Sequence, residues 1–173
     1  MKAVVVSGAG RSFSAGADLA SFGDPAANQG LTVREAADAG RLMAEAIEAM
    51  SAVTVAAIHG HCIGGGVVLA AACDLRVAAE DTYFSIPEVD LGIPLAWGGI
   101  PRLVREIGPA LTRELVLTCR PFTATEAQAF GFLNRVVVAE QVRATAVELA
   151  DGLSTRSRLT LTATKRHVNA VLE

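Results

Sequence analysis

The sequence predicts an α/β fold with mostly parallel strands. Short β-branched or apolar runs alternate along the chain with segments whose apolar residues recur at helical spacing. This alternation is typical of a parallel sheet covered by helices. The 173 residues suit one domain, and 51% of them are apolar, which is enough to build a core. No repeat of fixed period and no low-complexity linker interrupts the pattern.

The first third of the chain predicts two strands around one helix. Residues 3–6, AVVV, form a short strand, and residues 7–30 form a long loop rich in Gly, Ala and Ser. Thr32 and Glu35 make a capping box, so a helix begins there. Residues 53–58, VTVAAI, read as a buried strand. Long loops in compact domains are usually functional or mobile, which draws attention to residues 7–30.

The middle of the chain predicts a second helix and two further strands. The stretch HGHCIGGGVVLAAACD turns into a helix at its glycines, and residues 75–79 and 82–86 read as strands. A helix is then expected from Trp97 to Gly108, where glycine suits a C-terminal cap. Pro109 suits the first turn of a following helix that runs through Cys119.

The last third predicts mainly helices. Thr123 and Glu126 make a second capping box, and Gly131 ends that short helix. Residues 136–138, VVV, read as a short strand, and the remainder reads as helical.

Charge and apolar content narrow the class of protein. The net charge is −3 and the 15 basic residues are scattered, so nucleic acid is not an expected partner. No apolar stretch reaches the 18 or so residues that a membrane span needs. The opening MKAVVVSGAGRSF is too short in its apolar part for a signal peptide. We therefore expect a cytoplasmic protein that does not bind membranes.

The three cysteines predict no disulfide and no metal. Cys62, Cys73 and Cys119 are odd in number and stand in apolar surroundings, as reduced core cysteines do. His59 and His61 lie close to Cys62, but no further ligands follow at a matching spacing. The histidines are better interpreted as turn residues.

Two glycine-rich stretches could present backbone N–H groups to a ligand. They are SAGADL, residues 14–19, and CIGGGVV, residues 62–68, and each follows a strand. Two N–H groups aimed at one point, one of them at a helix N-terminus, would make an oxyanion hole for a thioester enolate. Taken singly, each stretch is better explained as a turn that needs glycine for steric reasons.

A dinucleotide site is not favoured. Gly8 and Gly10 give G-x-G, but Phe13 stands where the third glycine belongs and no helix follows directly.

The candidate acids lie later, in SIPEVDLGIP, where Glu88 and Asp90 interrupt an apolar stretch. A carboxylate in apolar surroundings can be tuned into a general base, although a surface loop acid is the commoner case.

Taken together, these motifs resemble the crotonase (enoyl-CoA hydratase/isomerase) family in order and spacing, over nearly the whole chain. The motifs are GAGRSFSAGADL, AAIHGHCIGGGVVLAAACDLRVAAEDTYFSIPEVDLGIP, GGIPRL and LTCRPFTATEAQAFGFLNRVV. The resemblance implies a crotonase-like ββα spiral core over residues 1–140. It also implies that residues 141–173 begin a C-terminal helical region used in assembly, so a homotrimer or hexamer is expected.

The resemblance also implies the ligand and its contacts. The substrate would be an acyl-CoA thioester, with coenzyme A as part of the substrate and no further cofactor. The N–H groups of Ala17 and Gly65 would bind the thioester oxygen. The loop around Ala15 would lie against the adenine end of coenzyme A.

One departure from the family pattern bears on the reaction. Hydratases of this family carry an acid two residues after the third glycine and a second acid in the Pro-Glu motif; here these positions are Val68 and Glu88. One carboxylate can still move a proton from C2 to C4 of a 3-enoyl thioester. This favours an isomerase with Glu88 as base. A hydratase using Glu88 alone and a non-catalytic acyl-CoA binder stay open as alternatives.

Three further interpretations concern residues outside these motifs. Ala96 stands where dienoyl isomerases of this family have an extra acid, which disfavours that reaction. Trp97 would either wall an acyl pocket or fill the core. Lys165 and Arg166 could meet coenzyme A phosphates, but a solvated helix face is the preferred interpretation.

The chain also looks short against the family at both ends. The usual opening β-hairpin and the closing helices are missing, so a truncated gene product or a misassigned start codon is expected. Asp18 and Asp74 are expected to be structural, as a turn acid and a strand-entry acid.

Overall fold

The strands form two small sheets. The computed structural model describes residues 1–18 and 32–171. The first sheet is parallel throughout, in the order β1 (Ala3–Ser7), β2 (Val53–Ile58), β4 (Leu75–Ala79) and β7 (Arg135–Val137). The second has the order β3 (His61–Ile63), β5 (Tyr83–Ser85) and β6 (Phe122–Thr123), with β3 and β5 parallel and β6 antiparallel to β5. The predicted α/β class with mostly parallel strands is confirmed.

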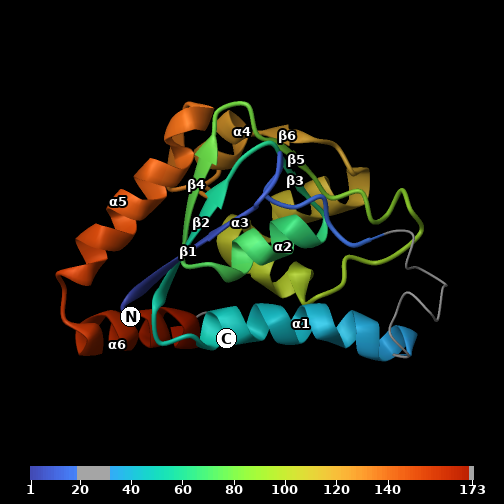
Figure 1. Ribbon diagram of the computed structural model, residues 1–173. Helices are drawn as coiled ribbons and strands as arrows, with labels where there is room; N and C mark the ends of the chain where they lie inside the picture. Colours follow the sequence, from blue (N-terminus) through green and yellow to red (C-terminus); the bar gives the residue numbers. More distant parts are fainter. Residues whose placement is uncertain (19–31, 172–173) are drawn as a thin grey trace.

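The helices lie on both faces of the first sheet (Figure 1). They are α1 (Val33–Ala49), α2 (Gly65–Ala72), α3 (Gly99–Thr118), α4 (Ala124–Ala129), α5 (Val142–Ser154) and α6 (Arg158–Val171), with a 3₁₀ turn, η2, at Ala139–Gln141. Helix α5 packs on β1, β2 and β4, while α2 packs against α1 and α3 on the opposite side. The site motifs therefore lie on the side away from α5.

Two hydrophobic cores follow from the alternation of side chains along the strands. Val55 and Ala57 of β2 pack with Val142 and Ala146 of α5 in the smaller core. Their neighbours in β2 point the other way and join the larger core around α2, α3 and α4. Both faces of β2 are thus covered, which explains why its sequence is continuously apolar.

Both predicted capping boxes are present. Thr32 and Glu35 exchange hydrogen bonds at the start of α1, and Thr123 and Glu126 do so at the start of α4. Each box satisfies two N–H groups that a helix N-terminus leaves without intrahelical partners. These boundaries were therefore correctly predicted from sequence.

The predicted start of the third helix is wrong by two residues. Trp97 has φ 58° and Gly98 has φ 67°, so both are left-handed and α3 begins only at Gly99. The predicted break at Gly108 is confirmed, because its φ of 77° interrupts α3 and Pro109 opens the next turn. Strands β3 and β6 were not predicted, since two or three residues carry too little periodicity.

The first residues of the chain contact the turn between the last two helices. Lys2 Nζ donates to the carbonyls of Ser154 and Arg156, at 2.7 and 2.8 Å, and so ties β1 to the turn between α5 and α6. Helices α1 and α6 run along one edge of the molecule (Figure 1). They are joined where Lys165 Nζ lies 3.4 Å from the Ile47 carbonyl oxygen.

The expectation that Lys165 lies on a solvated helix face is wrong. Its side chain is buried, and Nζ forms a 2.7 Å ion pair with Asp74 while also donating to the carbonyl of Ala52. Asp74 in turn accepts from the N–H and hydroxyl of Thr54, so it is structural as expected. Arg166 is exposed. The helix that carries both residues therefore buries one charge and exposes the next.

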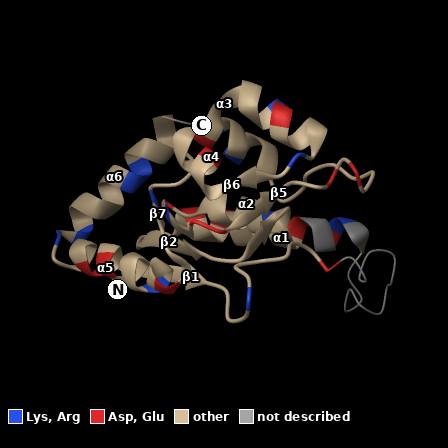
Figure 2. Ribbon diagram, turned by 90° about the horizontal axis from the view of Figure 1, so that it is seen from above, with Lys and Arg blue, Asp and Glu red and all other residues tan. Residues whose placement is uncertain are grey.

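The surface carries charges of both signs. Figure 2 shows basic and acidic residues interspersed along the ribbon of the helices and loops, without a long stretch of one sign. All three cysteines are buried and free, as expected. Among the described residues, no helix is long and apolar enough to cross a membrane.

Candidate active site

The three consecutive glycines at the start of α2 each make room for a different neighbour. A Cβ on Gly64 would lie 2.3 Å from Oε1 of Glu88, and one on Gly65 would lie 2.2 Å from the ring of Trp97. A Cβ on Gly66 would lie 2.8 Å from Cβ of Ser14. These distances are shorter than any normal carbon contact, so a side chain at any of the three would displace its neighbour. The glycine run thus brings a carboxylate, an indole and a loop against one helix end.

The backbone at Gly64 links this helix end to the strand that leads to Glu88. Gly64 has φ 51° and ψ −113°, a conformation that glycine alone adopts readily. Its N–H donates to the Ser85 carbonyl at 2.9 Å, at the end of β5. Glu88 follows three residues later, where the chain turns. The strand order therefore carries the carboxylate to the start of α2.

The loop before the undescribed segment runs beside β3. Ser14 pairs with Cys62 as an isolated parallel bridge: its N–H donates to the His61 carbonyl and its carbonyl accepts from the Ile63 N–H. Gly16 has φ 89°, and a Cβ there would lie 2.9 Å from the Ile63 carbonyl and 3.8 Å from the Gly65 nitrogen. The residue before Ala17 is thus in close contact with the backbone around Gly65.

The N–H groups of Ala17 and Gly65 are the two oxyanion donors that the family resemblance implies. No acceptor within residues 1–18 and 32–171 receives a hydrogen bond from either group. Gly65 is the first residue of α2, where the helix dipole is positive and the N–H has no intrahelical partner. The two predicted donors thus come from adjacent segments. Ala15 is exposed on the same loop, and Leu19, the last residue of SAGADL, lies outside the described residues.

Glu88 is an acid in a place that disfavours its charge. Its Oε2 is enclosed, and none of the described residues offers it a hydrogen bond. Burial raises the pKa of this carboxyl above its ordinary value, partly opposed by a hydrogen bond from its own backbone N–H. The other acid in the motif, Asp90, is exposed. The structure therefore separates the two candidate acids by burial, and only Glu88 lies at the glycine run.

Val68 lies one turn beyond Gly65, on the same face of α2. Its side chain is fully buried. A Cβ on Gly99 would lie 2.7 Å from Cγ2 of Val68 and 2.8 Å from Cγ of Leu95, so both side chains pack on Gly99. The position that carries an acid in the hydratase pattern is thus part of an apolar cluster.

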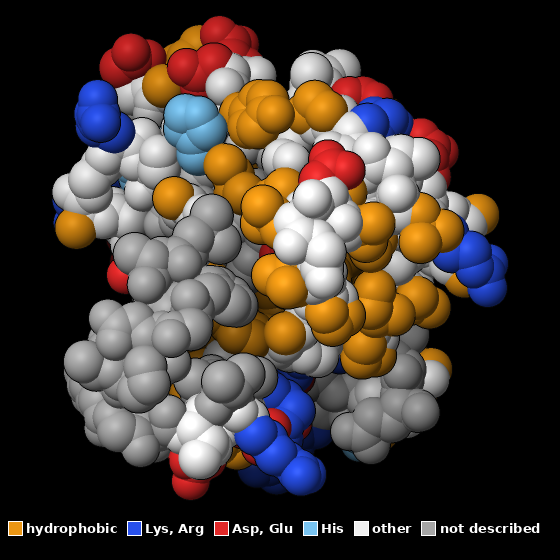
Figure 3. All heavy atoms as spheres, turned by 90° about the vertical axis from the view of Figure 1, so that its right-hand side faces the viewer, with side chains coloured by type: hydrophobic (Ala, Val, Ile, Leu, Met, Phe, Trp, Pro, Cys, Tyr) orange, Lys and Arg blue, Asp and Glu red, His pale blue; other side chains and the backbone are white. Residues whose placement is uncertain are grey.

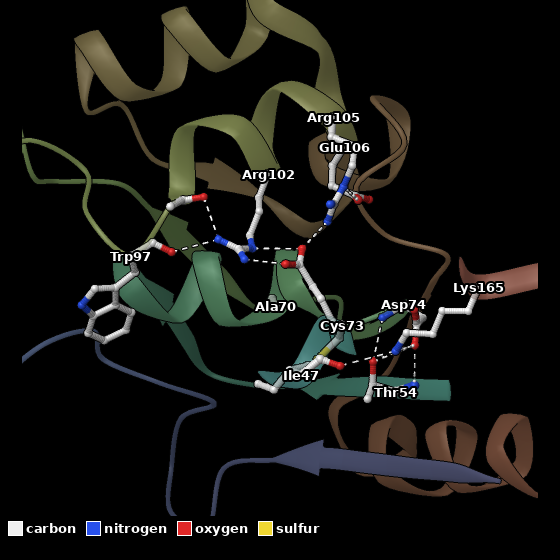
Figure 4. A network of polar contacts seen from close by, with 12 residues as sticks. Ile47, Thr54, Ala70, Cys73, Asp74, Trp97, Arg102, Arg105, Glu106 and Lys165 are labelled. Carbon is white, nitrogen blue, oxygen red and sulfur yellow. Dashed lines mark hydrogen bonds and ion pairs between the residues drawn. The ribbon is translucent and has the colours of Figure 1, made fainter. Parts of the chain in front are cut away.

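Trp97 is partly buried and lies between two helices. Its indole contacts Gly40 of α1 as well as Gly65 of α2, since a Cβ on Gly40 would lie 2.1 Å from its Nε1. Arg102 donates to the carbonyls of Trp97 and Gly98, both at 3.0 Å, and its Nε donates to Glu48 of α1 at 3.0 Å (Figure 4). Arg102 and Glu48 were not singled out in the sequence, because a pair 54 residues apart has no local signal.

The loop that carries Glu88 also shapes the outer surface. It lies on the right-hand side of the molecule in Figure 1, and Figure 3 shows hydrophobic side chains gathered on that side. On this loop, the exposed large apolar side chains are Val89 and Leu91. The acid is thus enclosed while its neighbours face outward.

A separate cavity of about 460 Å³ lies where α6 meets α1, α2 and α3. None of Ala17, Gly65 and Glu88 lines it. Its charged side chains bind one another, as in the pairs of Lys165 with Asp74 and of Arg105 with Glu48. The Glu88 carboxylate lies elsewhere, at the start of α2. Across the described ranges, no three His, Cys, Asp or Glu residues gather as a metal site would require.

Known proteins resemble the chain over nearly all of its length. The family described as Enoyl-CoA hydratase/isomerase matches residues 1–173. A mevalonyl-coenzyme A hydratase of Aspergillus fumigatus is 39% identical, over 88% of this chain and 56% of its own. A peroxisomal Δ(3,5)-Δ(2,4)-dienoyl-CoA isomerase of Arabidopsis thaliana is 37% identical, over 94% of this chain and 62% of its own.

A solved structure extends the likeness to the fold. A putative enoyl-CoA hydratase from Thermobifida fusca, in complex with CoA, superimposes with a TM-score of 0.86 at 28% identity, over 95% of this chain and 66% of its own. The chain spans between half and two thirds of the length of the curated relatives it matches. Sequence, fold and the glycine run agree, and the chain belongs to the enoyl-CoA hydratase/isomerase family, with its crotonase-like fold.

Proposed function

We propose that the protein isomerises 3-enoyl-CoA to 2-enoyl-CoA with Glu88 as its single base. The observation that carries the proposal is the Glu88 carboxylate, which lies against the start of α2 and whose enclosed Oε2 has no hydrogen-bond partner among the described residues. The apolar packing of Val68 supports a one-acid reaction, because the second acid of the hydratase pattern is replaced there.

The reaction follows from the placement of donors and base. The thioester oxygen accepts hydrogen bonds from the N–H groups of Ala17 and Gly65. Glu88 removes a proton from C2, and the electron pair of the C–H bond moves into a dienolate whose charge rests on that oxygen. The protonated Glu88 then returns the proton to C4 as the double bond moves to C2–C3. One carboxyl group therefore serves as base and then as acid, and atoms and charge balance.

Relatives support an acyl-CoA substrate. Both curated relatives named above are called enzymes of CoA esters, and the Thermobifida structure holds CoA. The loop at Ala15 is our candidate for the adenine end of coenzyme A. A homotrimer or hexamer stays a prediction, which size-exclusion chromatography with light scattering checks.

Hydration is the second candidate, because one of the relatives is named a hydratase. In that reaction Glu88 alone would activate the water, without a second acid at Val68 to share the proton transfers. A dienoyl isomerase is less favoured, since Ala96 is exposed and carries no acid. A non-catalytic acyl-CoA binder is the third candidate, and one experiment separates isomerisation, hydration and binding alone.

The test is mass spectrometry in heavy water. The protein is incubated separately with a 2-enoyl-CoA and a 3-enoyl-CoA, beside the variants Glu88→Gln and Asp90→Asn. For the wild type and for Asp90→Asn we expect a moved double bond, read from the fragment ions, without added water. Deuterium should enter the acyl chain to the extent that the proton on Glu88 exchanges with solvent before it is returned. Glu88→Gln should still bind but not turn over.

Other outcomes contradict the proposal. A mass gain of one water would identify a hydratase. Binding without turnover in the wild type would identify a binder. Turnover that survives Glu88→Gln would show that another group is the base.

A further inference from the structure

Trp97 is the only tryptophan of the chain, and its ring fills the space between two helices at the candidate site. One part of the indole contacts Gly40 of α1, and another contacts Gly65 of α2. Gly65 carries one of the proposed oxyanion donors, and the carboxylate of Glu88 contacts the residue before it. The ring thus lies against one proposed donor, and the residue next to that donor contacts the proposed base.

The indole is held in place by its backbone. Trp97 has a left-handed φ of 58°, which is rare for a bulky residue and persists only where surroundings enforce it. Arg102, itself buried, clamps the turn through the carbonyls of Trp97 and Gly98. The same guanidinium binds Glu48, so the turn is fixed to α1 as well (Figure 4). Such a clamp gives the ring a defined position against α2.

We propose that Trp97 is the end wall of the acyl site and restricts it to short acyl chains. The inference rests on the proposed function, which sets the thioester oxygen at the Gly65 N–H and the reacting carbons beside Glu88. A longer chain that continues between α1 and α2 meets the indole. One turn farther along α2, Val68 packs with Leu95 and Gly99, so this part of the helix face that carries Gly65 is also filled by side chains. Without the indole, the gap between Gly40 and Gly65 would open.

The single tryptophan supplies a first test that needs no turnover. Emission of Trp97 is followed while the wild type is titrated with butanoyl-CoA, with dodecanoyl-CoA and with coenzyme A alone, and calorimetry measures binding independently. We expect butanoyl-CoA to shift the emission and coenzyme A alone to leave it unchanged. Butanoyl-CoA should also bind more tightly than dodecanoyl-CoA. Butanoyl-CoA that binds by calorimetry without altering the emission would overturn the inference.

The second test changes the wall. Trp97→Ala and Trp97→Phe are compared with the wild type on 3-butenoyl-, 3-octenoyl- and 3-dodecenoyl-CoA. The ratio of kcat/KM for dodecenoyl over butenoyl should rise about tenfold or more in Trp97→Ala. Trp97→Phe keeps more of the packing, so it should fold even if the alanine variant does not, and its ratio should rise by less. Leu91→Ala, an exposed change on the same loop, is the matched control and should leave the ratio unchanged.

The outcomes separate this inference from the proposed function. Two results would contradict the role of Trp97 as end wall while the isomerase proposal stands. One is an unchanged ratio of kcat/KM for dodecenoyl over butenoyl in both Trp97 variants, and the other is a wild type that prefers dodecenoyl-CoA. If the wild type turns nothing over but Trp97→Ala binds dodecanoyl-CoA about tenfold more tightly than before, the wall stands and the isomerase proposal fails. If no acyl-CoA binds to the wild type by calorimetry, both are overturned.

Discussion

Glu88 sits in surroundings that oppose the charge its proposed role requires. Burial raises the pKa of this carboxyl, and Oε2 has no hydrogen-bond partner among the described residues. A raised pKa makes a carboxylate a stronger base, which suits proton removal from carbon. It also means that the folded state holds the ionised form less well than the unfolded chain does. Activity and stability should therefore respond in opposite directions to changes at this residue.

Glu88→Gln should stabilise the protein at neutral pH. Above the folded-state pKa, the folded protein carries a poorly solvated carboxylate that the amide variant lacks. We expect a gain of at most about 1 kcal/mol in the free energy of unfolding, because the group is still partly solvated. The gain should shrink as pH falls through the raised pKa and vanish below the ordinary value of 4.5. Urea unfolding at pH 7 and at pH 4 measures it, and a gain that grows in acid would contradict the assignment.

The pH dependence of turnover should follow the same carboxyl group. The base must be ionised, so kcat/KM should rise with pH through a pKa that lies above 4.5. Glu88→Gln should reduce kcat by about 10²- to 10⁴-fold, the usual contribution of a general base. Steady-state rates from pH 4 to 8 test this, with Asp90→Asn as the control that keeps the wild-type profile. A profile that is flat across this range would exclude Glu88 as the titrating group.

Val68→Glu tests what the apolar residue excludes. The new carboxyl would lie one turn from Gly65, at the position of the second acid in the hydratase pattern. We expect measurable hydration of 2-butenoyl-CoA, above whatever the wild type shows, at a cost of about 1–3 kcal/mol in stability from burying the carboxyl. Val68→Gln is the matched control, since it adds polarity without an acid. Equal hydration by both variants would show that the acid is not the missing element.

At the scale of one element, α2 has a partner at each end. Its first turn faces Glu88, Trp97 and Ser14, and its last carbonyls are bound by Arg76, whose Nη1 donates to Cys73 at 2.7 Å and Ala70 at 3.3 Å. The guanidinium is buried and also pairs with Glu106 of α3. Its positive charge lies at the negative end of the helix dipole, which stabilises the helix. This short helix is therefore held at both ends by contacts from other elements.

Gly64→Ala should damage the site and the fold together. The methyl group would lie 2.3 Å from Oε1 of Glu88, and φ 51° with ψ −113° is a strained conformation for alanine. We expect a loss of about 1–3 kcal/mol in stability, with lower activity in the protein that remains folded. Gly152→Ala, inside α5 with open space around it, should instead add about 0.5–1 kcal/mol. Thermal unfolding of both variants measures the contrast; equal shifts would contradict it.

Local signals in the sequence predicted the elements that local interactions define. The capping boxes at Thr32 and Thr123 and the break at Gly108 depend on neighbours within a few residues. The start of α3 was misplaced at Trp97 because Arg102 and α1 hold that residue in a left-handed turn. Of the site, Ala17, Gly65 and Glu88 were predicted from a family resemblance. The clamp of Arg102 on Glu48 could not be predicted, since it exists only once α1 and α3 are packed.

At the scale of the whole molecule, buried ion pairs join elements that are distant in sequence. Arg105 contacts both Glu48 of α1 and Glu106 within α3, which links the clamp at Trp97 to Arg76. A second cluster joins Lys165 of α6 to Asp74 and Thr54 beside β2. Such pairs add little net stability, but breaking one leaves an uncompensated buried charge. They therefore specify how the helices sit on the sheet.

Lys165→Met should destabilise the protein by about 3–5 kcal/mol, because Asp74 would lose its cationic partner in a mostly buried position. The double variant Lys165→Met with Asp74→Asn should recover part of that loss. Arg166→Met, the exposed neighbour, should change stability by less than about 0.5 kcal/mol. Urea unfolding of the three proteins checks these values. A loss at Lys165 no larger than that at Arg166 would show that the pair is not important for stability.

The contact between the first strand and the last helices has a consequence for biosynthesis. Lys2 binds the carbonyl of Ser154, 152 positions farther along the chain, and α5 packs on β1. A ribosome releases β1 long before it has made α5. The face of β1 on which α5 packs therefore stays exposed to solvent while most of the chain is synthesised. Contacts of such long range also slow folding, because a large loop must close before they form. The apolar strand AVVVS is thus exposed to chaperones and to aggregation until α5 has been made.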